Sequence, residues 1–330
     1  MKKRLAVLLL ALVLLCGCAQ RPVRQVVPDM PSAGDPAPTP SPTLQPSPVP
    51  QDVQRYGSVR LPGDPTVLVS VYLNDAATGS IWTKDARAQS QQSVAMAVDW
   101  LTRQAAGYGV DARIYYDDGT DTSPLCYTYS LRSRLRGGVD SEESNDFLDE
   151  MDALCATLDT AELEAKYGTT RVGFLLFLPV SGTSFTMAHY AEDGASFPYE
   201  YCCLYRYDAY SDRTEPESPA TYAHEILHLF GAPDLYEGSS DPYVDGDLTA
   251  YVAQTYPDEI MYSTYADDGS NLYTSIDKVI SPLTAYCIGL TDTCPELAQF
   301  PQLDQVEPGV FHYGDSGPQD LWPDSGMVTV

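Results

Sequence analysis

The sequence predicts an α+β domain built around one mixed, α/β-like sheet. Apolar stretches typical of strands alternate along the chain with stretches whose apolar residues recur at helical spacing. Residues 171–180 are nearly all apolar, which indicates a central strand covered on both faces. No internal repeat is visible, so we expect one sheet with the element order strand, helix, strand, helix, strand, edge strand, strand, helix.

Four elements are expected in the first half of the domain. Residues 65–74 alternate and are rich in valine, which is typical of a strand. Residues 86–106 carry an apolar stripe that predicts a helix, and the glycines that follow it lead into a strand over 110–116. Residues 141–167 predict one long acidic helix.

The second half continues the pattern up to a short apolar stretch near residue 260. Residues 181–190 are more polar than the central strand, as is typical of an edge strand. Residues 199–207 predict a further strand, and residues 281–290 predict a C-terminal helix. Residues 235–258 are acidic and turn-rich, and residues 296–330 lack periodicity, so we expect a loosely held tail there.

One motif, HEILHLFGAPD from His224 to Asp234, carries chemistry. Two histidines four residues apart on a helix lie one turn above each other, so both imidazoles can reach one metal ion. Glu225 would then lie beside that ion, where it can deprotonate a water molecule. Because the chain has only four histidines, two unrelated core histidines flanking a glutamate are the weaker interpretation.

A third ligand is expected from the residues that follow the motif helix. Ser218 and Pro219 favour the start of that helix, and Gly231 can end it in a left-handed conformation. The chain can then fold back and bring Asp234 to the metal. Glu237 and Glu259 are the alternatives if the chain does not turn at this glycine.

The N-terminal residues predict export. Residues 1–17 combine a basic start with an apolar run too short to be a good membrane span, as in a signal peptide. The run ends in a sequence that resembles a bacterial lipobox, which implies cleavage before Cys18 and attachment of lipid to its sulfur. Residues 18–55 then form a lipid anchor and proline-rich linker. An ordinary secretory signal or a short membrane anchor is the alternative.

Beyond this linker we expect the catalytic domain over 56–295 and the irregular tail over 296–330. The formal net charge of the chain is −27. A surface this acidic, without a basic stretch, argues against a nucleic-acid partner. Export makes disulfides possible, and Cys287 and Cys294 are the most natural pair by sequence separation, although sequence does not fix the connectivity. Buried free thiols are the alternative for all six cysteines after Cys18.

The motif resembles that of the metzincin clan of zinc peptidases, in particular members whose motif ends in aspartate. Met261, 27 residues after Asp234, stands where the clan has its Met-turn, an apolar floor beneath the metal. The resemblance implies a twisted, mainly parallel sheet with an antiparallel edge strand and an active-site helix. The commoner third ligand of the clan is histidine, so Asp234 is a departure from the pattern.

The resemblance also implies the activity. His224, His228 and Asp234 would bind Zn²⁺, and Glu225 would act as general base in the hydrolysis of peptide bonds of extracellular or cell-surface proteins. A substrate would lie extended along residues 183–189, where His189 is a weaker candidate for the site. His312 has no expected role.

Two other functions stay open. The first is a surface-anchored, adhesin-like binding lipoprotein in which the zinc site is structural or vestigial. The second is a zinc hydrolase that acts on a non-peptide amide. Acidic clusters also make Ca²⁺ a candidate ligand, although none has the EF-hand spacing; they lie at residues 117–121, 241–247 and 267–268.

Overall fold

One sheet lies at the centre of this computed structural model, which describes residues 59, 61–75, 78–120, 123–133, 142–188, 200–209, 214–239, 241, 244–305 and 328–329. Its strands are β1 (Thr66–Asn74), β2 (Ile114–Tyr115), β3 (Cys126–Ser130), β4 (Val172–Ser181), β5 (Phe185–Met187), β6 (Tyr201–Tyr207) and β7 (Val328–Thr329). The order across the sheet is β5-β6-β4-β1-β3-β7, and β2 pairs with β1.

The sheet is parallel in its centre and antiparallel at both ends. β1 runs parallel to β2, β3 and β4, and β4 runs parallel to β6. The end strands β5 and β7 pair antiparallel with β6 and β3. The predicted α+β class with one mixed sheet is therefore confirmed, and so are the central strand, seen as β4, and the edge strand, seen as β5.

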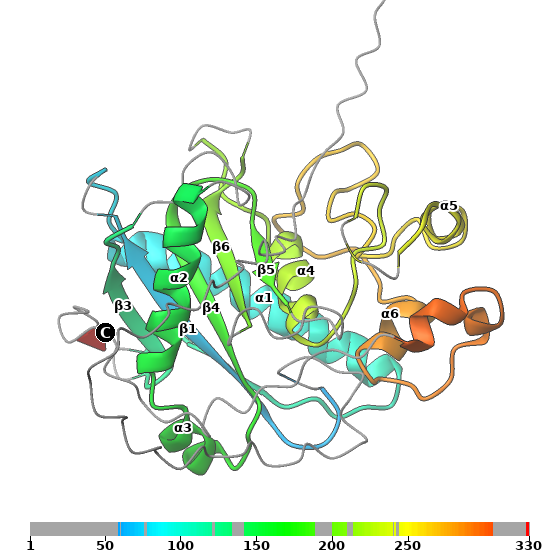
Figure 1. Cartoon of the computed structure of the whole chain (residues 1–330), viewed down its shortest axis with the longest axis horizontal. Coiled ribbons are helices and arrows are strands. Elements are labelled where there is room, and N and C mark those ends of the chain that lie inside the picture. The colour runs from blue at the N-terminus through cyan, green and yellow to red at the C-terminus, as the bar shows by residue number, and fades with distance from the viewer. Residues whose placement is uncertain are drawn as a thin grey trace, which may run out of the picture.

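Helices cover both faces of this sheet (Figure 1). Helices α1 (Lys84–Gly107) and α4 (Pro219–Leu229) contribute to one apolar core, and helices α2 (Glu142–Thr157) and α3 (Thr160–Tyr167) to the other. In β1, Val67, Val69 and Val71 face the second core, whereas Leu68 and Tyr72 face the first. This period of two is what a strand buried on both faces requires.

Helix α4 lies close to the sheet because β4 has no side chain at one position. A Cβ atom on Gly173 would lie 3.0 Å from the Cδ1 atom of Leu229, on α4. That distance is shorter than ordinary van der Waals contact. The glycine therefore allows the motif helix to pack directly against the central strands.

Several predicted elements differ in extent from those observed. The long acidic helix is divided into α2 and α3, because the Asp159 side chain accepts a hydrogen bond from the Glu162 backbone N–H at 3.1 Å and caps a new helix. The strand expected over 110–116 is only β2. The turn-rich stretch contains helix α5 (Gly246–Thr255), which the side chain of Asp245 caps.

The prediction of a loosely held tail over residues 296–330 is wrong for residues 296–305. The expected helix over 281–290 is the shorter α6 (Pro282–Cys287), followed by the 3₁₀ helices η3 (Pro295–Ala298) and η4 (Pro301–Gln305). Phe300 and Leu303 are buried in the same core as α1 and α4. Burial of these two side chains fixes residues that a proline-rich composition suggested would be loose.

The predicted disulfide is also wrong. Cys287 and Cys294 are both buried and form no disulfide among the described residues, and the same holds for Cys126, Cys155, Cys202 and Cys203. Cys202 and Cys203 face opposite cores, as adjacent strand residues should.

The signal peptide, Cys18, the linker and His312 lie outside the described residues. Among the helices that the structure describes, none combines the length and the apolar character needed to cross a membrane.

Candidate metal centre

The metal motif begins with a well-capped helix. The Ser218 hydroxyl accepts a hydrogen bond from the Thr221 backbone N–H at 3.1 Å, and Pro219 occupies the first turn of α4. Ala223, Ile226 and Leu227 are fully buried against the sheet side of the helix. The predicted helix start and its apolar face are therefore confirmed.

The end of α4 directs the chain back toward the histidines. Gly231 has a φ of 94°, a conformation that favours glycine. The Gly231 N–H donates to the His228 carbonyl at 2.9 Å, and the Ala232 N–H donates to the Leu227 carbonyl at 3.1 Å. These two bonds make a Schellman motif, which reverses the chain within three residues of Asp234.

Three ligand atoms meet beside α4. The Nε2 atoms of His224 and His228 are 3.3 Å apart, and Asp234 Oδ1 lies 3.1 Å from the first and 3.3 Å from the second. Three corners of a tetrahedron around zinc, with bonds of about 2.0–2.1 Å, are about 3.3 Å apart. The three side chains therefore fit three positions of a tetrahedral metal site. In the described part of the chain, the potential ligand atoms of these three residues all lie within 4.8 Å of one another.

Backbone carbonyls orient both imidazoles. The Nδ1 atom of His224 is 3.1 Å from the Ile260 carbonyl oxygen, and that of His228 is 2.7 Å from the Ala232 carbonyl oxygen. Since a carbonyl only accepts, each Nδ1 carries a proton, so the neutral form of each ring directs its Nε2 lone pair at the centre. This is the tautomer that a metal-binding histidine needs.

Hydrogen bonds also orient Asp234, the candidate third ligand. The Tyr236 hydroxyl donates to Asp234 Oδ2 at 2.9 Å, and the Asp234 backbone N–H donates to the Asp241 carboxylate. Asp234 Oδ1 is buried without a hydrogen-bond partner. A buried carboxylate oxygen facing two imidazole nitrogens needs a proton or a metal ion between them, and the donor set fits a bound metal ion.

In His224, His228 and Asp234, burial and the neighbouring charges shift the pKa values in opposite directions. Burial alone would lower the pKa of His228, but the Asp234 carboxylate outweighs it and raises that pKa to about 10. Desolvation also acts to lower the pKa of His224, but the neighbouring Asp234 carboxylate outweighs it, so that pKa is raised as well. Desolvation acts to raise the pKa of Asp234, yet the two histidines hold it well below its usual range. Protons therefore compete with a metal for this centre.

Glu225 lies one residue after the first ligand and is buried with it. Burial raises the pKa of the Glu225 carboxyl, while the neighbouring His224 and His228 act to lower it. Oε2 of Glu225 is 2.8 Å from the hydroxyl oxygen of Thr186, on the edge strand β5. The predicted base and the predicted ligands are thus brought into one cluster.

The segment that contains Met261 packs against this cluster. Met261 is fully buried, and its carbonyl accepts a hydrogen bond from the Leu235 N–H at 2.9 Å. The residue before it supplies the carbonyl that orients His224. The segment therefore supports both of the chain stretches that carry ligands.

The alternative ligands lie elsewhere. Glu237 is exposed. Glu259 is buried, but its carboxylate accepts hydrogen bonds from the Thr284 hydroxyl at 3.0 Å and from the backbone N–H of Ser281, at the start of α6. The expectation that Glu237 or Glu259 could replace Asp234 as the third ligand is therefore wrong. His189 lies outside the described residues.

The acidic clusters considered for Ca²⁺ contain carboxylates that are already engaged in local structure. The Gly119 N–H donates to Asp117 Oδ1 at 3.1 Å, and Asp245 accepts from the Leu248 N–H at 2.8 Å as the cap of α5. Asp268 accepts from Ser270. These bonds explain the turns in which the residues occur.

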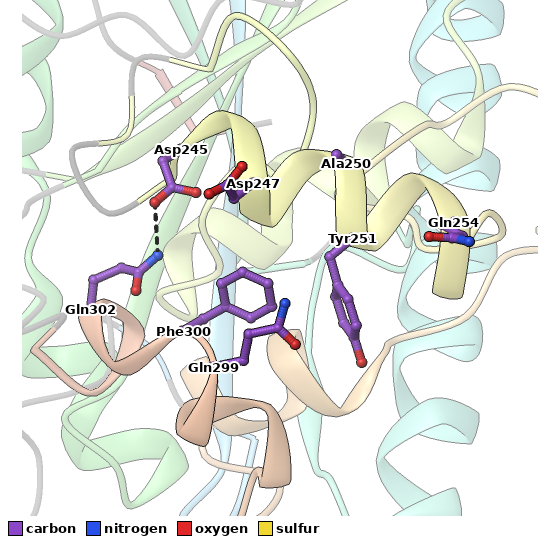
Figure 2. Close-up of a pocket in the computed structure, with 8 residues that line it drawn as sticks. All are labelled: Asp245, Asp247, Ala250, Tyr251, Gln254, Gln299, Phe300 and Gln302. Carbon is purple, nitrogen blue, oxygen red and sulfur yellow. Dashed lines mark hydrogen bonds between the residues drawn. The ribbon is translucent and has the colours of Figure 1, made fainter.

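A pocket of about 390 Å³ lies between α5 and the C-terminal 3₁₀ segments (Figure 2). Its polar lining groups are carboxylates, carboxamides and the Tyr251 hydroxyl, and none of the candidate metal ligands contributes to it. Asp245 there also accepts a hydrogen bond from Gln302 at 3.2 Å. The candidate metal centre on α4 is therefore separate from this pocket.

Sequence reasoning missed the residues that orient the site. Tyr236 and Asp241 hold Asp234, and Thr186 contacts Glu225. The alternation of β5 is the signal that could have placed Thr186 on the α4 side of the sheet. No local signal marks the carbonyl groups that orient the histidines.

Comparisons with known proteins assign no family to the chain. The sequence matches no known family model and no curated protein. A chain from a solved structure described as "Structure of a chaperone-substrate complex" is similar over 69% of this chain and 34% of that chain, at 11% identity and a TM-score of 0.28. This chain thus spans about a third of that chain, and a likeness this slight carries no argument.

Proposed function

We propose that this chain is an exported, zinc-dependent endopeptidase that is anchored through Cys18 and acts on extracellular or cell-surface proteins. The observation that carries the proposal is the convergence of three metal-binding atoms at tetrahedral spacing beside a buried glutamate. Three protein ligands leave a fourth position open, which distinguishes a catalytic zinc site from a closed structural one.

Each residue would have a defined role. His224, His228 and Asp234 would hold the ion, with the histidines fixed by the Ile260 and Ala232 carbonyls. Zinc bound there would lower the pKa of a water molecule and polarise the scissile carbonyl. Glu225 would accept a proton from the attacking water and transfer it to the leaving amine.

The edge strand offers a place for an extended substrate. β5 forms one end of the strand order and pairs with β6. A peptide that adds to such an edge forms backbone hydrogen bonds along its length. Thr186, at the centre of β5, contacts Glu225, so a peptide along this strand would pass beside the proposed base.

Burial of the cluster favours the second candidate, a binding lipoprotein with a structural or vestigial zinc site. Only 1–3% of each of His224, Glu225, His228 and Asp234 is exposed. A peptidase would need movement of surrounding residues to admit its substrate. A structural site would need none, but it would have no use for a base beside the metal.

Glu225→Ala separates these functions. Zinc content and cleavage of casein would be measured for the purified full-length wild type and the variant. We expect about one zinc per chain in both and a loss of cleavage of about 10²–10⁴-fold in the variant, since this is the usual contribution of a general base. Glu162→Ala, in α3 on the other face of the sheet, is the control and should leave cleavage unchanged.

Zinc binding without cleavage of any peptide library by the wild type would support the binding protein instead. If such a wild type hydrolysed other amides, the proposal of peptide bonds as substrate would be wrong, but the proposed zinc-dependent hydrolysis would stand. Absence of zinc from the wild type would remove the basis of both functions.

A further inference from the structure

Thr186 is buried at a position where a hydroxyl group needs a partner. It lies at the centre of β5 with 2% of its surface exposed. Its neighbours Phe185 and Met187 pack into the core that faces α2. By the alternation of a strand, Thr186 projects to the opposite side, toward α4 and the metal motif.

Its hydroxyl oxygen has three neighbours there. They are Glu225 Oε2 at 2.8 Å, the Glu225 backbone carbonyl at 2.9 Å and the Cys202 sulfur at 3.3 Å. A hydroxyl has only one proton to donate, and a carboxylate is the stronger acceptor. The Cys202 thiol lies 3.2 Å from the same carbonyl and can donate to it. The hydroxyl proton therefore belongs to the bond with Oε2.

This bond leaves one carboxylate oxygen for chemistry. Among the described residues, no hydrogen bond is made to Glu225 Oε1. Fixing Oε2 also fixes the plane of the carboxylate, so Oε1 keeps one direction instead of sampling several rotamers. A general base is effective only when its accepting oxygen is within hydrogen-bond reach of the proton it removes.

We propose that Thr186 is a positioning residue that holds Glu225 Oε2 and so keeps Oε1 directed at the water molecule that attacks the substrate. The inference rests on the proposed peptidase function. It assigns to the edge strand a second task besides carrying substrate, because the same strand would orient the base.

The test uses Thr186→Val, which removes the hydroxyl and keeps the shape, and Thr186→Ser, which keeps the hydroxyl. Zinc content, kcat and KM for one peptide would be measured with the full-length chain. We expect unchanged zinc content and KM in both variants. We expect kcat to fall by about 10–100-fold in T186V, as for other residues that orient a catalytic group, and to stay near wild type in T186S.

Thr169→Val, which makes the same exchange of side chains, is the matched control. The Thr169 hydroxyl is also buried, but it lies before β4, outside the proposed substrate strand, and accepts a hydrogen bond from the Arg171 N–H at 3.0 Å. Its loss should lower stability without lowering kcat. Thr186→Ala removes the same hydroxyl at smaller volume and replaces T186V if that variant does not fold.

A crystal structure of each variant gives a readout that is independent of activity. The Glu225 carboxylate should have one orientation in wild type and T186S and a different or mixed orientation in T186V. An unchanged orientation, equal kcat in T186V, or an equal loss in T186S would overturn the inference while the peptidase function stands. A wild type that binds zinc but cleaves no peptide would overturn both.

Discussion

Glu217 is a buried carboxylic acid immediately before the cap of α4. One of its oxygens, Oε1, accepts a hydrogen bond from the Ser218 N–H at 2.9 Å. Burial nevertheless raises the pKa of Glu217 to about 7, with a smaller contribution from Asp208. The residue is 6% exposed, so water can do little to stabilise its charge.

This raised pKa makes stability depend on pH. The folded state keeps the Glu217 proton up to about pH 7, whereas the unfolded state loses it near pH 4.5. The stabilising effect of the neutral acid is complete below pH 4.5, falls as the pH rises toward 7 and is absent above it. Glu217→Gln should therefore raise the free energy of unfolding at pH 8 by up to about 3 kcal/mol, and by much less at pH 5.

Urea unfolding at pH 5 and pH 8 measures this difference. Glu215→Gln, two residues earlier and exposed, is the control and should show no such dependence. Equal effects of Glu217→Gln at both pH values would contradict the assignment of a raised pKa to this residue.

At the scale of a single element, the end of α4 determines whether the ligand set is complete. The helix supplies His224 and His228, but Asp234 reaches them only because the Schellman motif at Gly231 reverses the chain. The carbonyl of Ala232, in the same turn, orients His228. One glycine therefore controls both the third ligand and the tautomer of the second.

Gly231→Ala tests this dependence. A Cβ atom at a φ of 94° is strained, which should cost about 1–2 kcal/mol in stability. Because the strain is relieved by moving the turn, we also expect zinc affinity to fall by at least about tenfold. Competition with a chromogenic chelator measures the affinity, and thermal unfolding measures the stability.

Gly168 gives a matched control for that variant. It ends α3 with a φ of 67°, and a Cβ atom there would meet nothing within 4 Å. Gly168→Ala should lose a similar amount of stability with no change in zinc affinity. Equal losses of affinity in both variants would show that the effect is global rather than local to the turn.

In the whole molecule, the candidate metal centre connects parts of the chain that are far apart in sequence. His224 bonds the Ile260 carbonyl, and the Leu235 N–H bonds the Met261 carbonyl. Glu259, beside them, accepts bonds from Ser281 and Thr284 at the start of α6. The sheet and the C-terminal helices thus meet around the ligands.

Removal of zinc should consequently loosen the whole domain. A ligand present at about 100 times its Kd stabilises the folded state by about 2.7 kcal/mol. For a domain of this size, a chelator should lower Tm by about 5–10 °C relative to the zinc-loaded chain. Scanning calorimetry with and without chelator measures the shift.

Two variants check that this shift arises at the centre. His228→Ala removes a ligand and should abolish the response to chelator. Glu225→Ala removes the proposed base but no ligand, so its response should match that of the wild type. A wild-type Tm that is the same with and without chelator would contradict metal binding at this site.

Local features of the sequence were enough to predict much of the site. The spacing of the motif, the Ser218 cap and Gly231 each act within a few residues, so α4 and its turn could be recognised without any tertiary information. The same holds for β1, α1 and β4, whose apolar periodicity reflects burial directly. Errors arose where one residue redirected the chain, as at Asp159 and Asp245.

The sequence by itself determined which side chains can bind a metal and which one can act as a base. Only the tertiary structure decided how Glu225 and His224 are held, because their contacts join residues 36–39 positions apart. The partners of Glu225 and His224 are a hydroxyl on an edge strand and a backbone carbonyl. Neither has a sequence pattern, since any residue can supply a carbonyl and many threonines are buried. The folding of the sheet against α4 brings them together.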